Sequence, residues 1–292
     1  MNLEQWDLDT IVANQGPHVA KLERFNTKMS SNTSFLDELK EKIASTLQKL
    51  LWAARTSRSE LIVPLTIISG RNFIQREHIL LLNNVLFYIQ NNIVKLKFPR
   101  FEKSSLRALM YADFLGSIQT PREKGVMGFI TFLTDATHKV APINWCSRVP
   151  RKICRGPNAG EAQALADGAA QAIYDIRGFQ DFFYQRVPLS IFPDSKCVFD
   201  GFVLFCPTTD LTALSDILAI RDSLARCEIE EINWIGTKEN PANCFTKSPF
   251  ASRKNNGVLK TCLRTGYLDT PVGAFVTRDA MHSDTRFDLS LS

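Results

Sequence analysis

Three short apolar segments separated by turns, followed by one long alanine-rich segment, restrict the fold of this chain most strongly. The short segments cover residues 106–113, 126–134 and 141–146, and their apolar, β-branched and aromatic residues are typical of strands. The turn between the last two strands is too short for a crossover, so we expect an antiparallel meander. Residues 161–183 are rich in alanine and then in aromatic residues, which predicts a long helix that packs on this sheet.

The remaining part of the chain continues to alternate between strands and helices. Residues 189–192 and 231–235 are predicted strands, residues 196–205 and 215–227 are predicted helices, and Asn243 opens a last helical turn. The order β-β-β-α-β-α-α-β-α predicts an α/β protein whose later strands are joined by helical crossovers. This is the order of the ribonuclease H fold, so we expect a mixed five-stranded sheet with flanking helices.

A small helical module precedes the predicted sheet. Apolar residues recur at helical spacing over residues 35–52, 61–69 and 74–90, whereas residues 95–100 are typical of an extended linker. The sequence therefore predicts four parts, namely a flexible N-terminal arm (1–34), a helical module (35–104), a ribonuclease H-like domain (105–250) and a C-terminal tail (251–292).

Composition excludes some classes of protein and leaves others open. The formal net charge of +5 suits a polyanionic partner such as nucleic acid, although many other proteins carry such a charge. No apolar run reaches the roughly 18 to 20 residues that a membrane helix needs, and the acidic N-terminus does not resemble a signal peptide. The 7 cysteines are odd in number and contain no Cys-x-x-Cys pair, so we expect neither a disulfide framework nor a zinc site. We expect a reducing location, in the cytoplasm or the nucleus.

Three carboxylates lie at the edges of predicted elements and can converge. Asp113 ends the first strand, Glu161 begins the long helix and Asp194 follows the fourth strand. Hydrolysis of a phosphodiester bond can use two divalent ions about 4 Å apart that carboxylates bridge. Because oxygen ligands without His or Cys suit Mg²⁺ or Mn²⁺, we expect two such ions at these residues.

Each of these residues also has a purely structural interpretation. Asp113 is at a position where turn residues are common, and Asp194 can cap the next helix. Glu161 can complement the dipole at the start of its helix, and Asn243 can cap the helical turn that it opens. The sequence leaves these alternatives open.

A set of motifs in fixed order connects these residues to a known family. The motifs are Tyr111-Ala112-Asp113-Phe114, Gly128 to Leu133, Cys146-Ser147-Arg148, Ala159-Gly160-Glu161, Pro193 to Asp200, Trp234-Ile235 and Asn240 to Lys247. From about Leu47 to Arg278, the chain resembles the C-terminal part of a Pol polyprotein from a Ty1/copia-type LTR retrotransposon of the sort common in fungi. Residues 51–58 resemble the connection after the polymerase palm, whose Tyr-x-Asp-Asp motif does not occur in this sequence.

The resemblance implies an activity and its residues. It implies a ribonuclease H that cuts the RNA strand of RNA–DNA hybrids with two metal ions, alongside a reverse transcriptase polymerase domain as partner. Asp113, Glu161 and Asp194 are then the metal ligands, and Asn243 is the fourth catalytic position. The expected nucleic-acid contacts are basic residues, namely Arg148, Arg151, Lys152, Arg155 and Lys196. The resemblance also implies a short helix near residues 258–268.

Two departures from the family pattern support an alternative. Asn243 replaces an aspartate and so removes a negative charge, and residues 208–214 lack the family's basic side chains. The alternative is therefore a catalytically inactive remnant of a mobile element that at most binds nucleic acid. An integrase-like nuclease shares the fold, but its essential Glu comes from a late helix, whereas Glu161 lies between the two aspartates. This order favours ribonuclease H.

Overall fold

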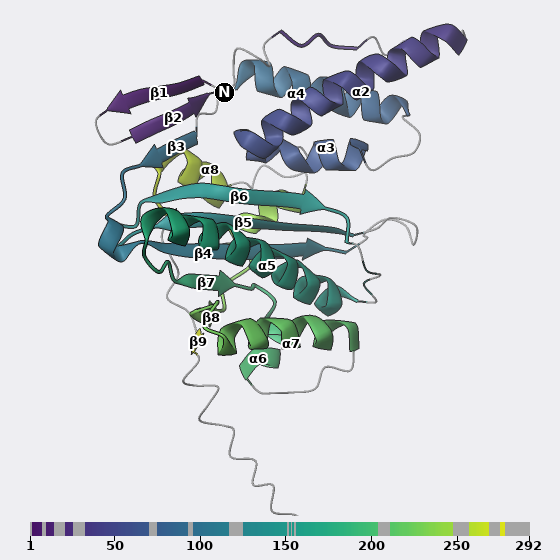
Figure 1. The fold of residues 1–292 in the computed structure, drawn as a ribbon. Coiled ribbons are helices and arrows are strands. Elements are labelled where there is room, and N and C mark those ends of the chain that lie inside the picture. Colours follow the sequence, from purple (N-terminus) through teal and green to yellow (C-terminus); the bar gives the residue numbers. More distant parts are fainter. Residues whose placement is uncertain are drawn as a thin grey trace, which may run out of the picture.

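The computed structural model describes residues 2–7, 10–14, 21–25, 33–69, 75–92, 96–116, 125–150, 152, 154, 156–203, 211–247, 257–268 and 275–277. Its central feature is a six-stranded sheet with the strand order β6-β5-β4-β7-β8-β9 (Figure 1). The strands are β4 (Arg107–Leu115), β5 (Val126–Thr134), β6 (Val140–Arg148), β7 (Leu189–Phe192), β8 (Glu231–Asn233) and β9 (Phe275–Thr277).

The directions of these strands confirm the predicted fold class. β4, β5 and β6 form an antiparallel meander, β7 runs parallel to β4, and β8 runs parallel to β7. These five strands are the mixed sheet of the ribonuclease H fold. The short strand β9 adds to the edge by pairing antiparallel with β8, and the sequence did not predict it.

Helices cover both faces of the sheet. One face carries α5 (Pro157–Phe183), with α6 (Lys196–Val203) and α7 (Leu211–Ala225) beside it. The other face carries the 3-10 helix η3 (Pro241–Phe245) and α8 (Gly257–Thr265), which is the helix that the resemblance implied. Residues of β4 alternate between the two faces, so Met110 contacts the α5 side and Tyr111 the opposite side.

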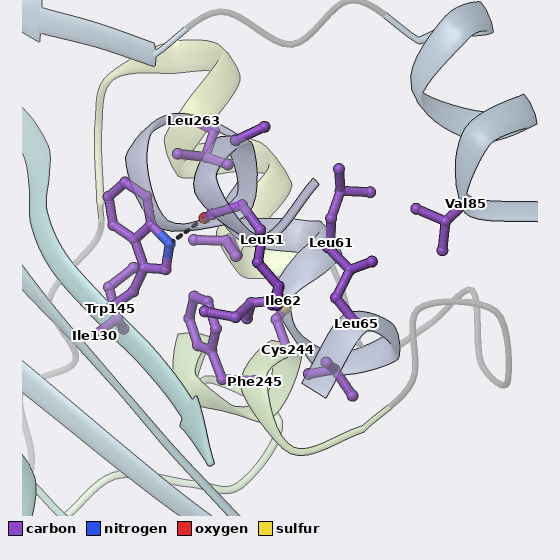
Figure 2. Packing of buried hydrophobic residues seen from close by; sticks show 14 of the residues in the cluster. Leu51, Leu61, Ile62, Leu65, Val85, Ile130, Trp145, Cys244, Phe245 and Leu263 are labelled. Carbon is purple, nitrogen blue, oxygen red and sulfur yellow. Dashed lines mark hydrogen bonds between the residues drawn. The ribbon is translucent and has the colours of Figure 1, made fainter. Parts of the chain in front are cut away.

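The helices near the N-terminus lie against the sheet. They are α2 (Thr33–Thr56), the 3-10 helix η1 (Ser59–Leu61), α3 (Ile62–Ser69) and α4 (Arg76–Asn91). Figure 2 shows their apolar side chains, such as Leu51 and Leu65, gathered around Phe245 and Trp145. The indole Nε1 of Trp145 donates a 2.7 Å hydrogen bond to the carbonyl of Ala54. The module and the sheet therefore share one hydrophobic core.

The structure differs from the sequence prediction at the N-terminus. The strands β1 (Asn2–Asp7) and β2 (Thr10–Asn14) pair with β3 (Leu96–Pro99) in a small antiparallel sheet, so these residues are not a flexible arm. β1 pairs with β2, and β2 also pairs with β3, which is more than 80 positions away and which a search for local periodicity does not detect. A 3-10 helix, η2 (Lys103–Ser105), leads from β3 to β4. Within the described ranges, no helix has the length and apolar character to cross a membrane.

Candidate metal centre

Asp113 lies near the end of β4 and is 3% exposed. Its place in the alternation of β4 puts it on the face that carries η3. The hydroxyl Oγ1 of Thr246 donates a hydrogen bond to its Oδ2, and the ammonium of Lys247 lies 3.6 Å from the same oxygen. The residues that follow η3 therefore fix the orientation of this carboxylate.

Glu161 and Asp194 approach Asp113 from two other elements. Glu161 is in the first turns of α5, whose start is set by Gly156 at the N-cap and Pro157 at the first helical position. Asp194 follows β7, and its carbonyl accepts a 3.2 Å hydrogen bond from the indole of Trp234. Because β4 and β7 are adjacent and parallel, their carboxyl ends meet at the same edge of the sheet.

The three carboxylates form one compact cluster. One oxygen from each of Asp113, Glu161 and Asp194 can be chosen so that all three lie within 4.8 Å of one another. Such a distance lets a single cation contact all three side chains. Within the part of the chain that the structure describes, this is the one such group of His, Cys, Asp or Glu side chains. The structure thus brings together the three residues that the sequence proposed.

Burial and mutual repulsion make the cluster unfavourable without a cation. Burial, followed by the nearby charges of Asp113 and Asp194, raises the pKa of Glu161 to about 9. Burial and then Asp113 raise the pKa of Asp194 to about 6, although the side chains of Asn240 and Thr237 and the charge of Lys247 offset part of this shift. A bound divalent ion would neutralise the carboxylate charges and so offset both the cost of burying them and their mutual repulsion.

The donor atoms also fit a hard divalent ion. Oδ2 of Asp194 is buried and has no hydrogen-bond partner among the described residues. A buried carboxylate oxygen without a donor is costly and is a natural metal ligand. The cluster offers only oxygen atoms, which matches Mg²⁺ or Mn²⁺ and not a metal that prefers sulfur or nitrogen.

Asn243 lies beside this cluster, and both its amide nitrogen and its amide oxygen form hydrogen bonds. It is 6% exposed within η3, and its Nδ2 donates to the carbonyls of Thr237 and Asn240, the latter at 3.1 Å. Its Oδ1 accepts a hydrogen bond from Lys247. Asn243 therefore orders the loop before η3 and contacts Asp113 through Lys247, and its part in catalysis stays a prediction.

Asn240 anchors this loop to β4, the strand that carries Asp113. Its Nδ2 donates a 2.7 Å hydrogen bond to the carbonyl of Ala112, and its Oδ1 caps η3 by accepting from the backbone of Ala242 at 2.9 Å. Asn240, Thr246 and Lys247 belong to the motif of residues 240–247, which predicts no role for any of the three. Nothing in their spacing reveals that all three act on the strand that carries Asp113.

The predicted nucleic-acid contacts are paired with acids wherever the structure describes them. Arg148 forms an ion pair with Asp167 at 2.6 Å, and Lys152 forms one with Asp216 at 2.7 Å. Arg151 and Arg155 lie outside the described residues.

Lys196 follows Asp194 of the acidic cluster by two positions in the sequence. Its ammonium pairs with Asp200 at 2.5 Å and lies 5.9 Å from the centre of the Trp234 ring. Partly exposed pairs such as these contribute little stability, so the cations can exchange their partners for phosphates. Their role in binding stays a prediction.

The comparisons with known proteins find similarity only at the level of structure. No protein-family model matches the chain, and no curated protein is significantly similar to it. Ribonuclease H1 from the archaeon Halobacterium salinarum is 15% identical, covers 47% of this chain and 90% of its own, and has a TM-score of 0.35. The N-terminal ribonuclease H domain of a Mycobacterium tuberculosis protein is 14% identical, covers 54% and 98%, and has a TM-score of 0.34.

A viral structure is similar to the same extent. The protease–reverse transcriptase of prototype foamy virus is 15% identical, covers 59% of this chain and 22% of its own, and has a TM-score of 0.30. None of these structures superposes closely on the chain at such values. The order and directions of the chain's own strands, β6-β5-β4-β7-β8, are what give it the ribonuclease H fold.

Proposed function

We propose that this protein is a ribonuclease H that hydrolyses the RNA strand of RNA–DNA hybrids with divalent metal ions. The observation that carries the proposal is the cluster of Asp113, Glu161 and Asp194 at the carboxyl edge of this sheet. The family motifs support an origin in a Ty1/copia-type Pol polyprotein, with a polymerase domain as partner. They also imply two ions of Mg²⁺ or Mn²⁺.

The chain's own residues prepare the reaction. Asp113, Glu161 and Asp194 would hold the metal, which when bound supplies Lewis acidity and an activated water for attack on the phosphodiester. Thr246 and Lys247 hold Asp113 in one orientation. Because the raised pKa of Glu161 keeps a proton on this side chain in the metal-free protein, metal binding releases that proton and becomes tighter as the pH rises.

The test is cleavage of a labelled RNA–DNA hybrid by the purified chain across a titration of Mg²⁺ and Mn²⁺. We expect cutting of the RNA strand of the hybrid, and none of single-stranded RNA or duplex DNA. Asp113→Asn removes one charged ligand and should abolish cutting. Asp181→Asn is the matched control, since Asp181 is exposed near the far end of α5 and should leave cutting unchanged.

A second candidate function is a non-catalytic protein that only binds nucleic acid. The uncharged amide of Asn243 and its engagement by Lys247 favour this candidate. Asn243→Asp separates the two functions, because activity that appears only in this variant would show that the native centre is inactive. Cutting by the native chain that Asp113→Asn abolishes would exclude the second candidate.

A further inference from the structure

Lys247 places a positive charge within the acidic cluster. Its ammonium lies 3.6 Å from Oδ2 of Asp113 and donates a hydrogen bond to Oδ1 of Asn243. The side chain of Lys247 is 26% exposed. Among the described residues, no other Lys, Arg or His forms an ion pair with Asp113, Glu161 or Asp194.

The charge of Lys247 acts on the whole cluster and not only on its nearest neighbour. It lies 3.6 Å from Asp113, whose carboxylate shares one compact cluster with those of Glu161 and Asp194, so the ionised form of each is attracted to it. An ammonium ion that stabilises all three carboxylates neutralises part of the negative charge that a metal ion would otherwise neutralise.

A count of charges limits how many metal ions the cluster can hold. Three carboxylates and one ammonium leave two net negative charges when all four groups are ionised, which one divalent ion neutralises. A second divalent ion would leave a buried net positive charge and would be repelled by both the first ion and Lys247.

The side chain at position 243 does not supply the negative charge that a second divalent ion would need. Asn243 adds no charge, its amide nitrogen donates to two backbone carbonyls, and its amide oxygen accepts from Lys247. The oxygen that could have served a second ion is thus already bound to a cation of the protein itself.

We propose, on the basis of the nuclease function proposed above, that the free protein holds one divalent ion and that the Lys247 ammonium takes the place of the second cation. Asn243 and Lys247 then act together, since the uncharged oxygen of one holds the charge of the other beside Asp113. The two-ion arrangement that the family resemblance implies would not form in this chain.

The test counts Mn²⁺ ions bound to the purified chain without nucleic acid, by electron paramagnetic resonance of the unbound ion and by calorimetric titration. We expect one ion per native chain, and two per chain for Lys247→Met, which keeps an unbranched side chain of nearly the same length and removes its charge. The first ion should bind Lys247→Met about tenfold or more tightly than it binds the native chain, because a nearby like charge is lost. Lys247→Arg keeps the charge and should bind one ion.

Lys238→Met is the matched control, because Lys238 is exposed in the turn before Asn240 and forms no ion pair with the three acids. It should bind one ion with the native affinity. If Lys247→Met does not fold by circular dichroism, Asn243→Asp replaces it, since this variant adds one negative charge to the same cluster. We expect two ions in that variant.

The outcomes separate this inference from the nuclease function. Two ions of similar affinity on the native chain would overturn the role of Lys247 and leave the nuclease function standing, as would a Lys247→Met chain that still binds one ion. A native chain that binds no Mn²⁺ at millimolar concentration would overturn both.

Discussion

The raised pKa of Glu161 makes the metal-free protein less stable at high pH. The ordinary pKa of this side chain is 4.5, and in the folded protein the value is about 9. Between these values, the folded chain keeps a proton that the unfolded chain has released, so the free energy of unfolding falls as the pH rises. The same reasoning applies to Asp194 between its ordinary value of 3.8 and about 6.

Glu161→Gln removes the larger part of this pH dependence. At pH 8 the variant should gain on the order of 1 to 3 kcal/mol in free energy of unfolding, because the native side chain must take up a proton on folding at this pH and a neutral amide need not. Thermal unfolding between pH 5 and 9 without metal measures the effect, with the exposed Glu239→Gln as the matched control. If the melting temperatures of both variants depend on pH as that of the native chain does, Glu161 is not the source of the pH dependence. Adding Mn²⁺ should flatten the native curve, since the ion replaces the proton.

Asn243→Asp has a structural cost that its charge alone does not suggest. The amide nitrogen of Asn243 donates to the carbonyls of Thr237 and Asn240, and a carboxylate would face these two oxygens without a proton to share. We expect the metal-free variant to lose about 1 to 3 kcal/mol in free energy of unfolding, less whatever its contact with Lys247 restores. Chemical denaturation without metal measures this loss, and saturating Mn²⁺ should reverse it. A metal-free variant as stable as the native chain would contradict this account of the loop.

At the scale of elements, close packing between β5 and η3 positions the centre. Gly128 on β5 is the strand partner of Asp113, and a Cβ atom at Gly128 would lie 2.4 Å from Cβ of the buried Phe245 and 2.9 Å from its backbone. Only a residue without a side chain allows η3 to approach this strand so closely. The next two residues after Phe245 are Thr246 and Lys247, which hold Asp113.

Gly128→Ala should therefore displace η3 and disturb the centre together. We expect a loss of about 1 to 3 kcal/mol in free energy of unfolding from overpacking, and a smaller increase in melting temperature on adding Mn²⁺ than the native chain shows. Gly178→Ala is the matched control, because Gly178 lies in α5 with open space around it, and alanine there should stabilise the helix by about 0.5 to 1 kcal/mol. If Mn²⁺ raises the melting temperature of Gly128→Ala and of the native chain equally, the position of η3 does not affect the metal centre.

Elements with strong local patterns could be predicted from the sequence, whereas contacts between distant elements could not. The strand β5 and the helix α5 show clear periodicity, and the structure has them close to the predicted bounds. The strands β1 and β2 form a hairpin with each other, and only β2 pairs with the distant β3, whose place in the sheet no local pattern indicates. The three acids could be found because their order matches a family pattern, but the contact of Lys247 with Asp113 depends on how η3 packs on β5.

At the scale of the whole molecule, the helical module and the ribonuclease H-like domain complete each other's core. The sequence divides them at residues 104 and 105, yet buried side chains of both belong to one continuous cluster (Figure 2). The hydroxyl of Thr66 on α3 donates a 3.1 Å hydrogen bond to the carbonyl of Ser147 on β6, in addition to the bond between Trp145 and Ala54. The module also contacts η3, so it supports the element that precedes Thr246 and Lys247.

A chain that begins at residue 105 should therefore not keep the native metal centre. Without the module, Trp145 and the neighbouring part of its face of the sheet would lose the side chains of α2 and α3 that pack on them, and burying a large apolar side chain is worth about 1.5 to 3 kcal/mol. We expect this fragment to bind a hydrophobic dye, to unfold without a sharp transition and to show no increase in melting temperature with Mn²⁺. A chain that begins at residue 21 is the control, because it lacks β1 and β2 but keeps the module, and it should unfold cooperatively and respond to Mn²⁺. If the fragment from residue 105 instead folds and binds Mn²⁺ as the full chain does, the two cores are independent, and the centre needs no support from the module.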